Sequence, residues 1–540
     1  MNLIKENPLD RMLKDANILV IDDFQGMRTM LRNIIKDIGG IKIDTAANGR
    51  EAMGQLRGTR YDLVICDYNL GPGPNGQHVL EEAKLNQYIG PSCVWVMVTA
   101  EKTSDMVMGA AEIKPDDYIL KPINHDTLES RLEKLIARKR TLSAIESAVR
   151  AKDFPAAIAA CDQRIQERPP NLQEILRIKA DLLLDSGRLD DAAKVFDTVL
   201  AQRSVPWAKT GLAKVHFQRK EFDTAIGLLQ EVIADNRIYM EAYDWLAKVL
   251  QAKGDTTQAL QVLQNATQLS PNAAVRQKNL GDVAYKSGDL DLAQKAFEKN
   301  IKITEFSPTK SAAVYANLAK VYSGKKMDSD ALGMLARSKK EFRDDPVAGL
   351  ETAIAESMVY RGMGQEDKAK EAMEQAHKLN QELGNKVQPA LSMEMAQAML
   401  QSGQTEGATA LLRSLVKNHH DNPALAAQVQ QVFESASLGE QGRALIERSR
   451  QEVVDINNQG VSLGREGRYE EAIALLRQAQ QELPENETVL LNLCGLLIVH
   501  IKRNGPQEAL ETEVRELLRH AQAINPANRK LQEYSAALAR

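Results

Sequence analysis

A short pattern of small residues recurs along most of this chain and constrains its fold more than any other feature. Segments such as "SGRLDDAAKVF", "SGDLDLAQKAF" and "EGRYEEAIALL" align: five residues after a glycine stands an alanine, and four later a large apolar residue. The aligned alanines are Ala157, Ala192, Ala225, Ala259, Ala293, Ala331, Ala369, Ala408, Ala472 and Ala509. Their successive spacings are 35, 33, 34, 34, 38, 38, 39, 64 and 37. From residue 141 onward the sequence therefore predicts an internal repeat rather than one compact core.

A second small residue stands twelve positions before most of these alanines. These residues are Ala180, Ala213, Ala247, Gly281, Ala319, Ser357, Ala396 and Gly460. Two small residues at this offset let a pair of antiparallel helices approach closely, and the large residue fills the next layer. The pattern resembles the tetratricopeptide repeat (TPR), whose period is 34, and Pro169, Pro271 and Pro484 match the terminating proline of that family.

The TPR resemblance implies an all-α superhelical solenoid over residues 141–540, with about nine to ten helix pairs. The interval of 64 residues predicts a degenerate pair, and it leaves the register near 418–455 open. The protein-binding surface of such an array would supply the output of the protein.

The first 140 residues have a different texture, in which short β-branched runs alternate with helical patterns. The expected strands are "NILVID", "IKIDTA", "YDLVICD", "CVWVMVT" and "DDYIL". Helical patterns follow each of them, including "GMRTMLRNIIKDI", "GREAMGQL", "GQHVLEEAKLN", "MVMGAAEI" and "DTLESRLEKLI". Five strands alternating with five helices predict an α/β, flavodoxin-like (βα)5 domain over residues 1–140, with a parallel sheet covered on both faces.

Polar side chains stand where the predicted strands end. Asp22 and Asp23 follow the first strand, Asp67 ends the third, Thr99 the fourth, and Lys121 follows the fifth. Ligands of doubly wound sheets bind beyond the carboxyl ends of the strands, so these side chains should line one crevice. Three carboxylates make chemical sense around a hard cation such as Mg²⁺. Asp67 can then act as a nucleophile toward a phosphoryl group, whose oxygens Thr99 and Lys121 would stabilise.

With these residues in place, "DDFQGMRTMLRNIIKDIG" and "VTAEKTSD" make residues of about 15 to 138 resemble the receiver domain of two-component response regulators, above all CheY-like chemotaxis regulators. The resemblance implies that Asp67 is the phosphoacceptor and that Mg²⁺ is held by Asp23, Asp67 and the main-chain carbonyl of Asn69, with Asp22 assisting. It also implies that Thr99 and Lys121 bind the phosphoryl oxygens and that Tyr118 is the switch aromatic. Asn69 and Glu101 would tune dephosphorylation, and the Lys121–Pro122 bond would be cis.

Simpler readings of single features remain beside these roles. The Asp22–Asp23 pair alone could be a helix N-cap, and Tyr118 alone could be core filler. The loop "DYNLGPGPNG" is one residue longer than the usual receiver form, so its conformation is open. "ARKR", residues 137–140, is interpreted as a solvated helix face rather than a nucleic-acid patch.

Composition excludes several classes of function. A net charge of -4 and 26% charged residues show no basic excess that would hold nucleic acid. The four cysteines form no C-x-x-C pair, and the most apolar stretch, Val489–Ile501, is too short to cross a bilayer. We therefore expect a cytoplasmic protein without membrane insertion. The repeat region supplies no nucleophile–base pair and no phosphate-binding loop, so no separate catalytic domain is expected, only self-dephosphorylation.

Two function classes follow from these features. In the first, a histidine kinase or phosphotransfer protein phosphorylates Asp67, and the repeat surface then captures or releases a protein partner. In the second, the array is a constitutive scaffold and the receiver is a docking module or phosphate sink. The first is favoured because all the phosphorylation residues are present.

The connection between the two regions contains no helix breaker. Residues 123–154 include neither Gly nor Pro, so the last receiver helix is expected to run unbroken into the first repeat. Leu128, Leu135, Leu142 and Val149 recur every seven residues and predict one apolar stripe along this helix. Such a helix would act as a rigid lever, or would alter self-association, so a homodimer is one option.

Overall fold

The chain divides into two compact units, Met1–Val314 and Tyr315–Arg540. The computed structural model describes residues 13–90, 92–100, 115–505, 507–525 and 528–538.

A five-stranded sheet begins the first unit. Its strands are β1 (Asn17–Ile21), β2 (Lys42–Ala46), β3 (Leu63–Asp67), β4 (Val94–Thr99) and β5 (Asp117–Leu120). They are all parallel and lie in the order β2-β1-β3-β4-β5. Every residue of β3 and β4 is buried, as expected for central strands covered on both faces. The predicted doubly wound α/β fold is therefore confirmed.

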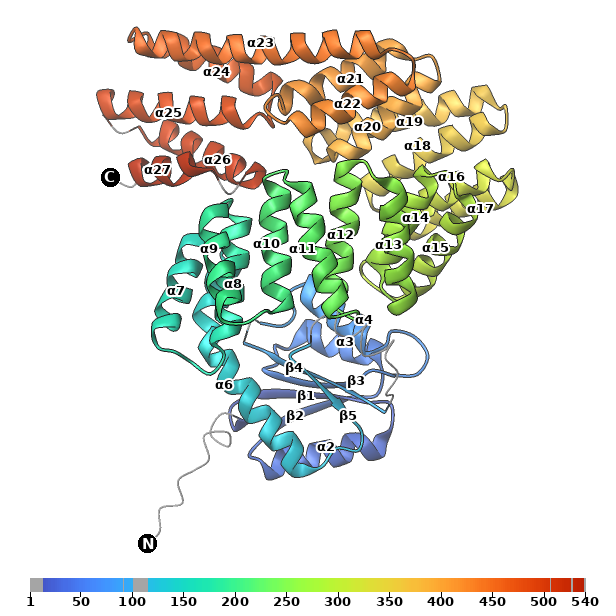
Figure 1. Ribbon diagram of the computed structural model, residues 1–540, viewed down its shortest axis with the longest axis vertical. Helices are drawn as coiled ribbons and strands as arrows, with labels where there is room; N and C mark the ends of the chain where they lie inside the picture. The colour runs from blue at the N-terminus through green and yellow to red at the C-terminus, as the bar shows by residue number, and fades with distance from the viewer. Residues whose placement is uncertain (1–12, 91, 101–114, 506, 526–527, 539–540) are drawn as a thin grey trace. The chain divides into compact units, whose positions relative to one another are not determined.

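Helices cover both faces of this sheet (Figure 1). On one face lie α2 (Gln25–Asp37) and α6 (His125–Arg150), which bury Leu31, Ile35, Leu128 and Leu132 against the strands. On the other lie α3 (Gly49–Gly58) and α4 (Gly76–Leu85), whose apolar residues pack around Trp95. The helix expected at "GMRTMLRNIIKDI" is confirmed as α2. The helix expected at "MVMGAAEI" lies outside the described residues.

The helix α6 confirms the expected continuous connection, because it runs from the five-stranded sheet into the first helix pair without a break. Leu128, Leu135 and Leu142 are buried as predicted, but Val149 is 39% exposed, so the stripe does not extend that far. A straight helix with 3.6 residues per turn drifts by about 20° per heptad, which rotates the fourth member away from the shared face.

Two side chains of the "ARKR" segment are ion-paired, so the interpretation of this segment as a solvated face is wrong for them. The Arg138 guanidinium binds Glu174 in the array and lies 3.2 Å from Asp116 Oδ1 at the edge of the sheet. Lys139 Nζ lies 3.1 Å from the same Asp116 oxygen. The sequence pattern alone did not reveal these pairs because both acidic partners lie on other elements.

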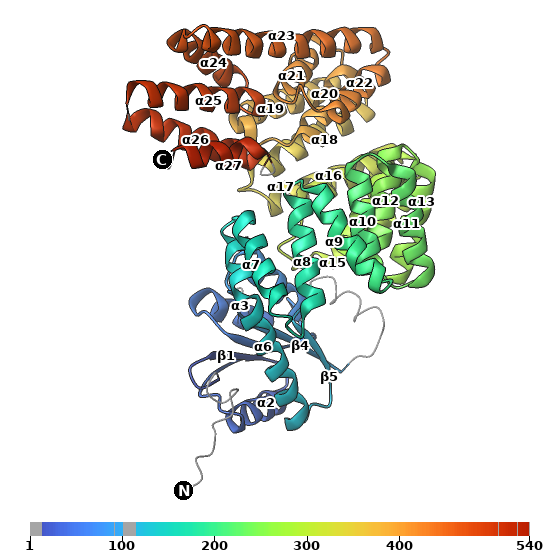
Figure 2. The same ribbon diagram turned by 60° about the vertical axis from the view of Figure 1, so that its left-hand side comes forward.

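Antiparallel helices make up the rest of the first unit (Figure 2). They are α7 (Phe154–Gln166), α8 (Leu172–Asp185), α9 (Leu189–Gln202), α10 (Pro206–Gln218), α11 (Phe222–Asp235), α12 (Met240–Lys253), α13 (Thr256–Leu269), α14 (Ala274–Lys286) and α15 (Leu290–Ile303). Each packs against the next along the chain. Pro169 and Pro271 follow the ends of α7 and α13, as the repeat pattern predicted.

The small residues of the repeat lie where the helices touch. The aligned alanines from Ala157 to Ala472 are at most 1% exposed. A Cβ built on Gly281 would lie 2.5 Å from the ring of Phe297, so only glycine fits there without movement. Ala509 is the exception, because it lies exposed in the first turn of its helix. The alignment of this last position is therefore wrong.

The second unit continues the helical pattern. The helix α16 (Ala312–Gly324) crosses the boundary, and the others are α17 (Asp328–Glu341), α18 (Pro346–Gly362), α19 (Glu366–Leu383), the 3-10 helix η1 (Gly384–Lys386), α20 (Pro389–Gln401), α21 (Thr405–Asn418), α22 (Pro423–Ser435), α23 (Gly439–Arg465), α24 (Tyr469–Glu482), α25 (Glu487–Asn504), α26 (Glu508–Ile524) and α27 (Arg529–Leu538). Together with the helices of the first unit they form the predicted all-α repeat region.

The long interval in the repeat is occupied by α22 and α23. The helix α23 has 27 residues and carries both the end of the degenerate segment and Gly460. A regular repeat would have two short helices joined by a turn in this part of the chain, whereas here one continuous helix takes their place. Among the helices of the described residues, none combines the length and apolar character needed to cross a membrane.

Candidate functional site

The carboxyl ends of the central strands bring the predicted residues together. In the parallel register Ile21 of β1 pairs with Cys66 of β3, and Asp67 pairs with Val98 of β4. Asp22, Asp67 and Thr99 therefore emerge at the same edge of the sheet. The crossover connections of a parallel sheet create this edge, since they place every strand end of one kind on one side.

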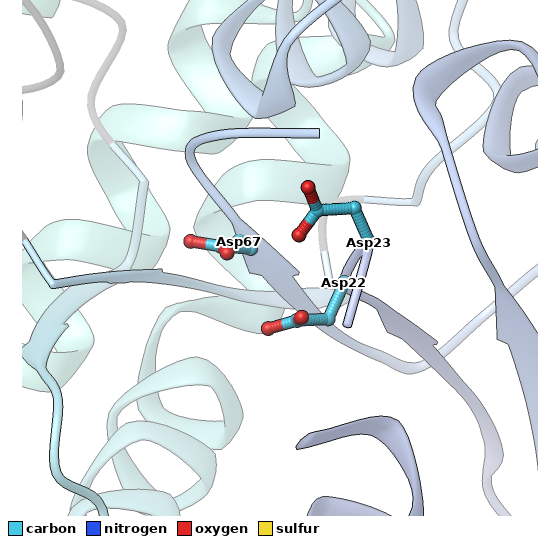
Figure 3. Close-up of side chains that lie close together, drawn as sticks. All are labelled: Asp22, Asp23 and Asp67. Atoms are coloured by element: carbon cyan, nitrogen blue, oxygen red, sulfur yellow. The ribbon is translucent and has the colours of Figure 1, made fainter. Parts of the chain in front are cut away.

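Three carboxylates form a cluster at this edge (Figure 3). One oxygen from each of Asp22, Asp23 and Asp67 lies within 4.8 Å of the other two. Asp22 is fully buried and Asp67 is 6% exposed, whereas Asp23 is open to solvent. Hard divalent cations prefer such oxygen ligands, so the donor set fits Mg²⁺. An N-cap explanation of the aspartate pair is insufficient, because the N-cap residue of α2 is Phe24 and it makes no side-chain cap.

Lys121 joins the two buried carboxylates. Its Nζ lies 2.8 Å from Asp22 Oδ2 and 2.8 Å from Asp67 Oδ2. Burial alone would lower the pKa of Lys121, but the hydrogen bonds to both carboxylates outweigh it and raise the pKa, so the ammonium stays charged. Burial, together with the nearby Asp22, raises the pKa of Asp67 despite this lysine. The single positive charge of Lys121 is shared between two carboxylates. Their negative charge is therefore only partly balanced, and a cation bound at the site could balance the rest.

The remaining predicted residues lie around this centre. Thr99 is 1% exposed, and its carbonyl oxygen accepts the Lys121 N–H at 2.8 Å. Tyr118 is half-buried on β5 and packs against the cluster around Trp95. Asn69 is exposed just beyond β3, and Glu101 lies outside the described residues. The Lys121–Pro122 peptide bond is cis, as expected from the resemblance.

The Gly-Pro-rich loop after Asp67 has a defined path. Gly71 and Gly73 adopt positive φ angles of 73° and 111°, which other residues rarely adopt. The loop ends in a capping box, in which Asn75 and His78 bind each other's main-chain N–H groups. A Cβ on Gly76 would lie 2.1 Å from the carbonyl oxygen of Asp67, so α4 begins in direct contact with that residue.

Sequence reasoning missed two side chains. The Arg28 guanidinium donates to the main-chain oxygens of Asp22 at 2.7 Å and Asp23 at 3.2 Å, and so ties the end of β1 to α2. His78 caps α4 and reaches the carbonyl of Ile303, 225 positions away. Spacing could have indicated the capping box, but no local signal pointed to the distant contact.

A parallel (βα) sheet with carboxylates and a lysine at its carboxyl edge defines the receiver class, and comparison with known proteins agrees. The family model of the response regulator receiver domain matches residues 18–133. Tetratricopeptide-repeat models match residues 177–241, 210–274 and 245–308, and another matches residues 360–432. Neither kind of model describes a separate catalytic domain.

Individual relatives cover the receiver part. Chemotaxis protein CheY-3 of Vibrio cholerae is 31% identical over 125 residues, which are 23% of this chain and 95% of that protein. Chemotaxis protein CheY of Pseudomonas aeruginosa is 31% identical over 121 residues, 22% of this chain and 96% of that one. A solved tetratricopeptide-repeat protein from Parabacteroides merdae, 12% identical, covers 45% of this chain and 92% of its own, with a TM-score of 0.32.

The chain therefore belongs to the response regulators. Its receiver domain has CheY homologues and is followed by tetratricopeptide repeats.

Proposed function

We propose that this response regulator is controlled by phosphorylation of Asp67 and that its repeat array is the protein-binding output. The placement of the Asp67 carboxylate, 2.8 Å from the Lys121 ammonium and beside Asp22 and Asp23, carries this proposal. We place the boundary between the receiver, residues 1–140, and the array, residues 141–540, within α6.

The chemistry assigned to Asp67 is nucleophilic. One of its carboxylate oxygens attacks the phosphorus of a phosphohistidine on a histidine kinase or phosphotransfer protein; the P–N bond breaks and an acyl phosphate forms. Lys121 and Thr99 would hold the phosphoryl oxygens by charge and hydrogen bonding. Mg²⁺, when held by Asp23, Asp67 and the Asn69 carbonyl with Asp22 beside them, would neutralise the charge on those oxygens.

The acyl phosphate is expected to be short-lived. Asn69 and Glu101, at the positions that tune dephosphorylation in the family, are polar and can orient a water that attacks phosphorus, releasing inorganic phosphate and restoring the carboxylate. We expect a phosphorylated form that does not survive for hours. Tyr118, half-buried on β5, is the proposed switch aromatic.

The output is assigned to the array. Since α6 belongs to the receiver sheet and to the first helix pair, a change at the sheet can move the array as a rigid body. Arg138, bound to both Asp116 and Glu174, supports such a stiff connection. A cytoplasmic location is part of the proposal, and the four buried, unpaired cysteines fit a reducing compartment.

The test is modification by a small acyl phosphate donor. With acetyl phosphate and Mg²⁺, intact-mass spectrometry should detect one phosphoryl group on the protein, and Asp67→Asn should lose it completely. Asp37→Asn makes the same change at an exposed position in the same domain and should be modified as the wild type is. Modification that persists in Asp67→Asn would refute the assignment.

A scaffold that ignores phosphorylation is the competing function. Partner capture from a lysate, with and without beryllofluoride and Mg²⁺, separates the two. A partner set that changes with beryllofluoride supports the switch, and an unchanged set supports the scaffold.

A further inference from the structure

The receiver touches the repeat array at a place far from α6. His78 and Glu81 on α4 meet the connection between α15 and α16, residues 304–311. His78 Nε2 lies 3.3 Å from the carbonyl oxygen of Ile303, and its ring meets Phe306 edge-on, with 6.4 Å between centroids. Ser307 Oγ donates to Glu81 Oε2 at 2.5 Å. The connection after α15, four repeats beyond the first helix pair of α6 and α7, thus contacts the receiver.

Each polar atom in this contact has a defined partner. His78 Nδ1 accepts the Asn75 N–H at 3.2 Å, so the ring proton lies on Nε2 and is donated to Ile303. Burial lowers the pKa of His78, which favours this neutral form. Ser307 donates to Glu81 and accepts from the N–H and hydroxyl of Thr309, and it is 8% exposed. Since the polar groups of this contact are already hydrogen-bonded, moving either α4 or the α15–α16 connection would lengthen these hydrogen bonds and weaken the contact.

The same turn of α4 is also joined to the acceptor segment. The Gly76 N–H donates to the Tyr68 carbonyl at 2.9 Å, and the Tyr68 hydroxyl lies 3.2 Å from Gln77 Oε1. A Cβ on Gly76 would lie 2.1 Å from the Asp67 carbonyl oxygen, so the end of β3 and the start of α4 are in direct contact with no space between them. Movement of the main chain at Asp67 must therefore move the first turn of α4.

We propose that the first turn of α4 couples the acceptor site to the array: a phosphoryl group on Asp67 weakens the contact of His78 and Glu81 with the α15–α16 connection and frees that segment. The proposal rests on the proposed phosphorylation of Asp67 and names its regulation. By linkage, releasing the contact must strengthen phosphoryl binding by the same factor. The contact acts as an intramolecular brake that is independent of the α6 connection.

Substitutions in the α15–α16 connection can remove this contact without changing any residue of the receiver. In Phe306→Ala/Ser307→Ala, the acceptor site and the capping box of α4 keep all their residues. Calorimetric titration of the full chain with beryllofluoride in excess Mg²⁺ should give a dissociation constant about fivefold lower than wild type, the low end of typical coupling. Ile238→Ala, at a 64% exposed side chain in the α11–α12 connection, is the matched control and should keep the wild-type value.

Hydrogen exchange reports the contact directly. Beryllofluoride with Mg²⁺ should speed exchange of the amides of residues 303–311 several-fold in wild type but not in Asp67→Asn. If beryllofluoride binds in the calorimeter but leaves this exchange and the double variant's affinity unchanged, the coupling is wrong while the proposed function stands. If beryllofluoride does not bind and acetyl phosphate does not modify the protein, the proposed function fails and the brake fails with it.

Discussion

The receiver and the repeat array bury polar groups in opposite ways. In the receiver, Asp22 and Asp67 are buried side by side and oppose each other across one lysine. In the array, several buried polar side chains join neighbouring helices: Asn300 donates to the main-chain carbonyl of Ala274, and Ser357 to that of Ala369. Each of the two buried cations Arg276 and Lys320 has its own carboxylate partner. The receiver therefore concentrates unbalanced charge at one edge, where it can serve chemistry. The array uses its buried polar groups to join helices.

The two regions should also lose structure differently when a large core side chain is removed. Trp95 in β4 and Phe297 in α15 are at most 1% exposed, so replacing either by alanine should cost about 3–5 kcal/mol. Trp95→Ala should speed hydrogen exchange in all the receiver strands together, because they belong to one hydrogen-bonded sheet. Phe297→Ala should affect mainly α14, α15 and their neighbours, since each repeat contacts only adjacent repeats. Uniformly faster exchange across the whole array in Phe297→Ala would contradict this difference between the two regions.

The charge imbalance of the receiver predicts a smaller effect at Lys121. Lys121→Met leaves two buried carboxylates without their cation and should destabilise the receiver by about 3 kcal/mol in the presence of a chelator. Mg²⁺ should restore part of this loss in the variant by supplying positive charge. Exchange of the β3 amides measures both values.

Lys253→Met in the array is the control for Lys121→Met. It removes an exposed pair with Asp223 and should leave exchange unchanged. If Lys121→Met and Lys253→Met change hydrogen exchange equally, the buried charge at the receiver edge is no more important than an exposed ion pair of the array, and the proposed difference is wrong.

The close helix approach in the array predicts that Gly281→Ala destabilises it. The added methyl group would lie 2.5 Å from the buried Phe297 ring, and overpacking of this kind costs about 1–3 kcal/mol. Exchange protection in α14 and α15 should fall, while protection in the receiver strands should not change. A neutral result would mean that the ring can move aside.

The smallest effect is expected at Gly227, and it has the opposite sign. A Cβ there meets nothing within 4 Å, and the residue is exposed within α11. Gly227→Ala should therefore stabilise this helix by about 1 kcal/mol, because alanine has the higher helix propensity. Slower exchange of the α11 amides measures this gain. A loss of protection in Gly227→Ala would show that unseen contacts, rather than propensity, govern this position.

Local patterns in the sequence determined most of the fold. The alternation of β-branched runs with helical patterns predicted the parallel sheet, and the strand-end rule predicted that Asp22, Asp67, Thr99 and Lys121 meet at one edge. The small residues of the repeat predicted the helix contacts. These features could be predicted because each depends on neighbours within a strand, a helix or one repeat period. Val149 and Ala509 were wrongly predicted to be buried. In each case a regular spacing, the heptad of α6 or the period of the repeat, was extended by one step beyond the part of the chain that follows it.

Other contacts between distant groups could be recognised only in the folded molecule. The strand-end rule predicted that Lys121 lies near Asp22 and Asp67, but not that its ammonium binds both carboxylates. The contact of His78 with the carbonyl of Ile303 joins residues 225 positions apart that no spacing connects. The return of the array to α4 depends on the small rotation from each repeat to the next, summed over four repeats. A repeat pattern specifies that helices pack, but that rotation arises from the shapes of all the packed side chains, so it is expressed only in the folded molecule.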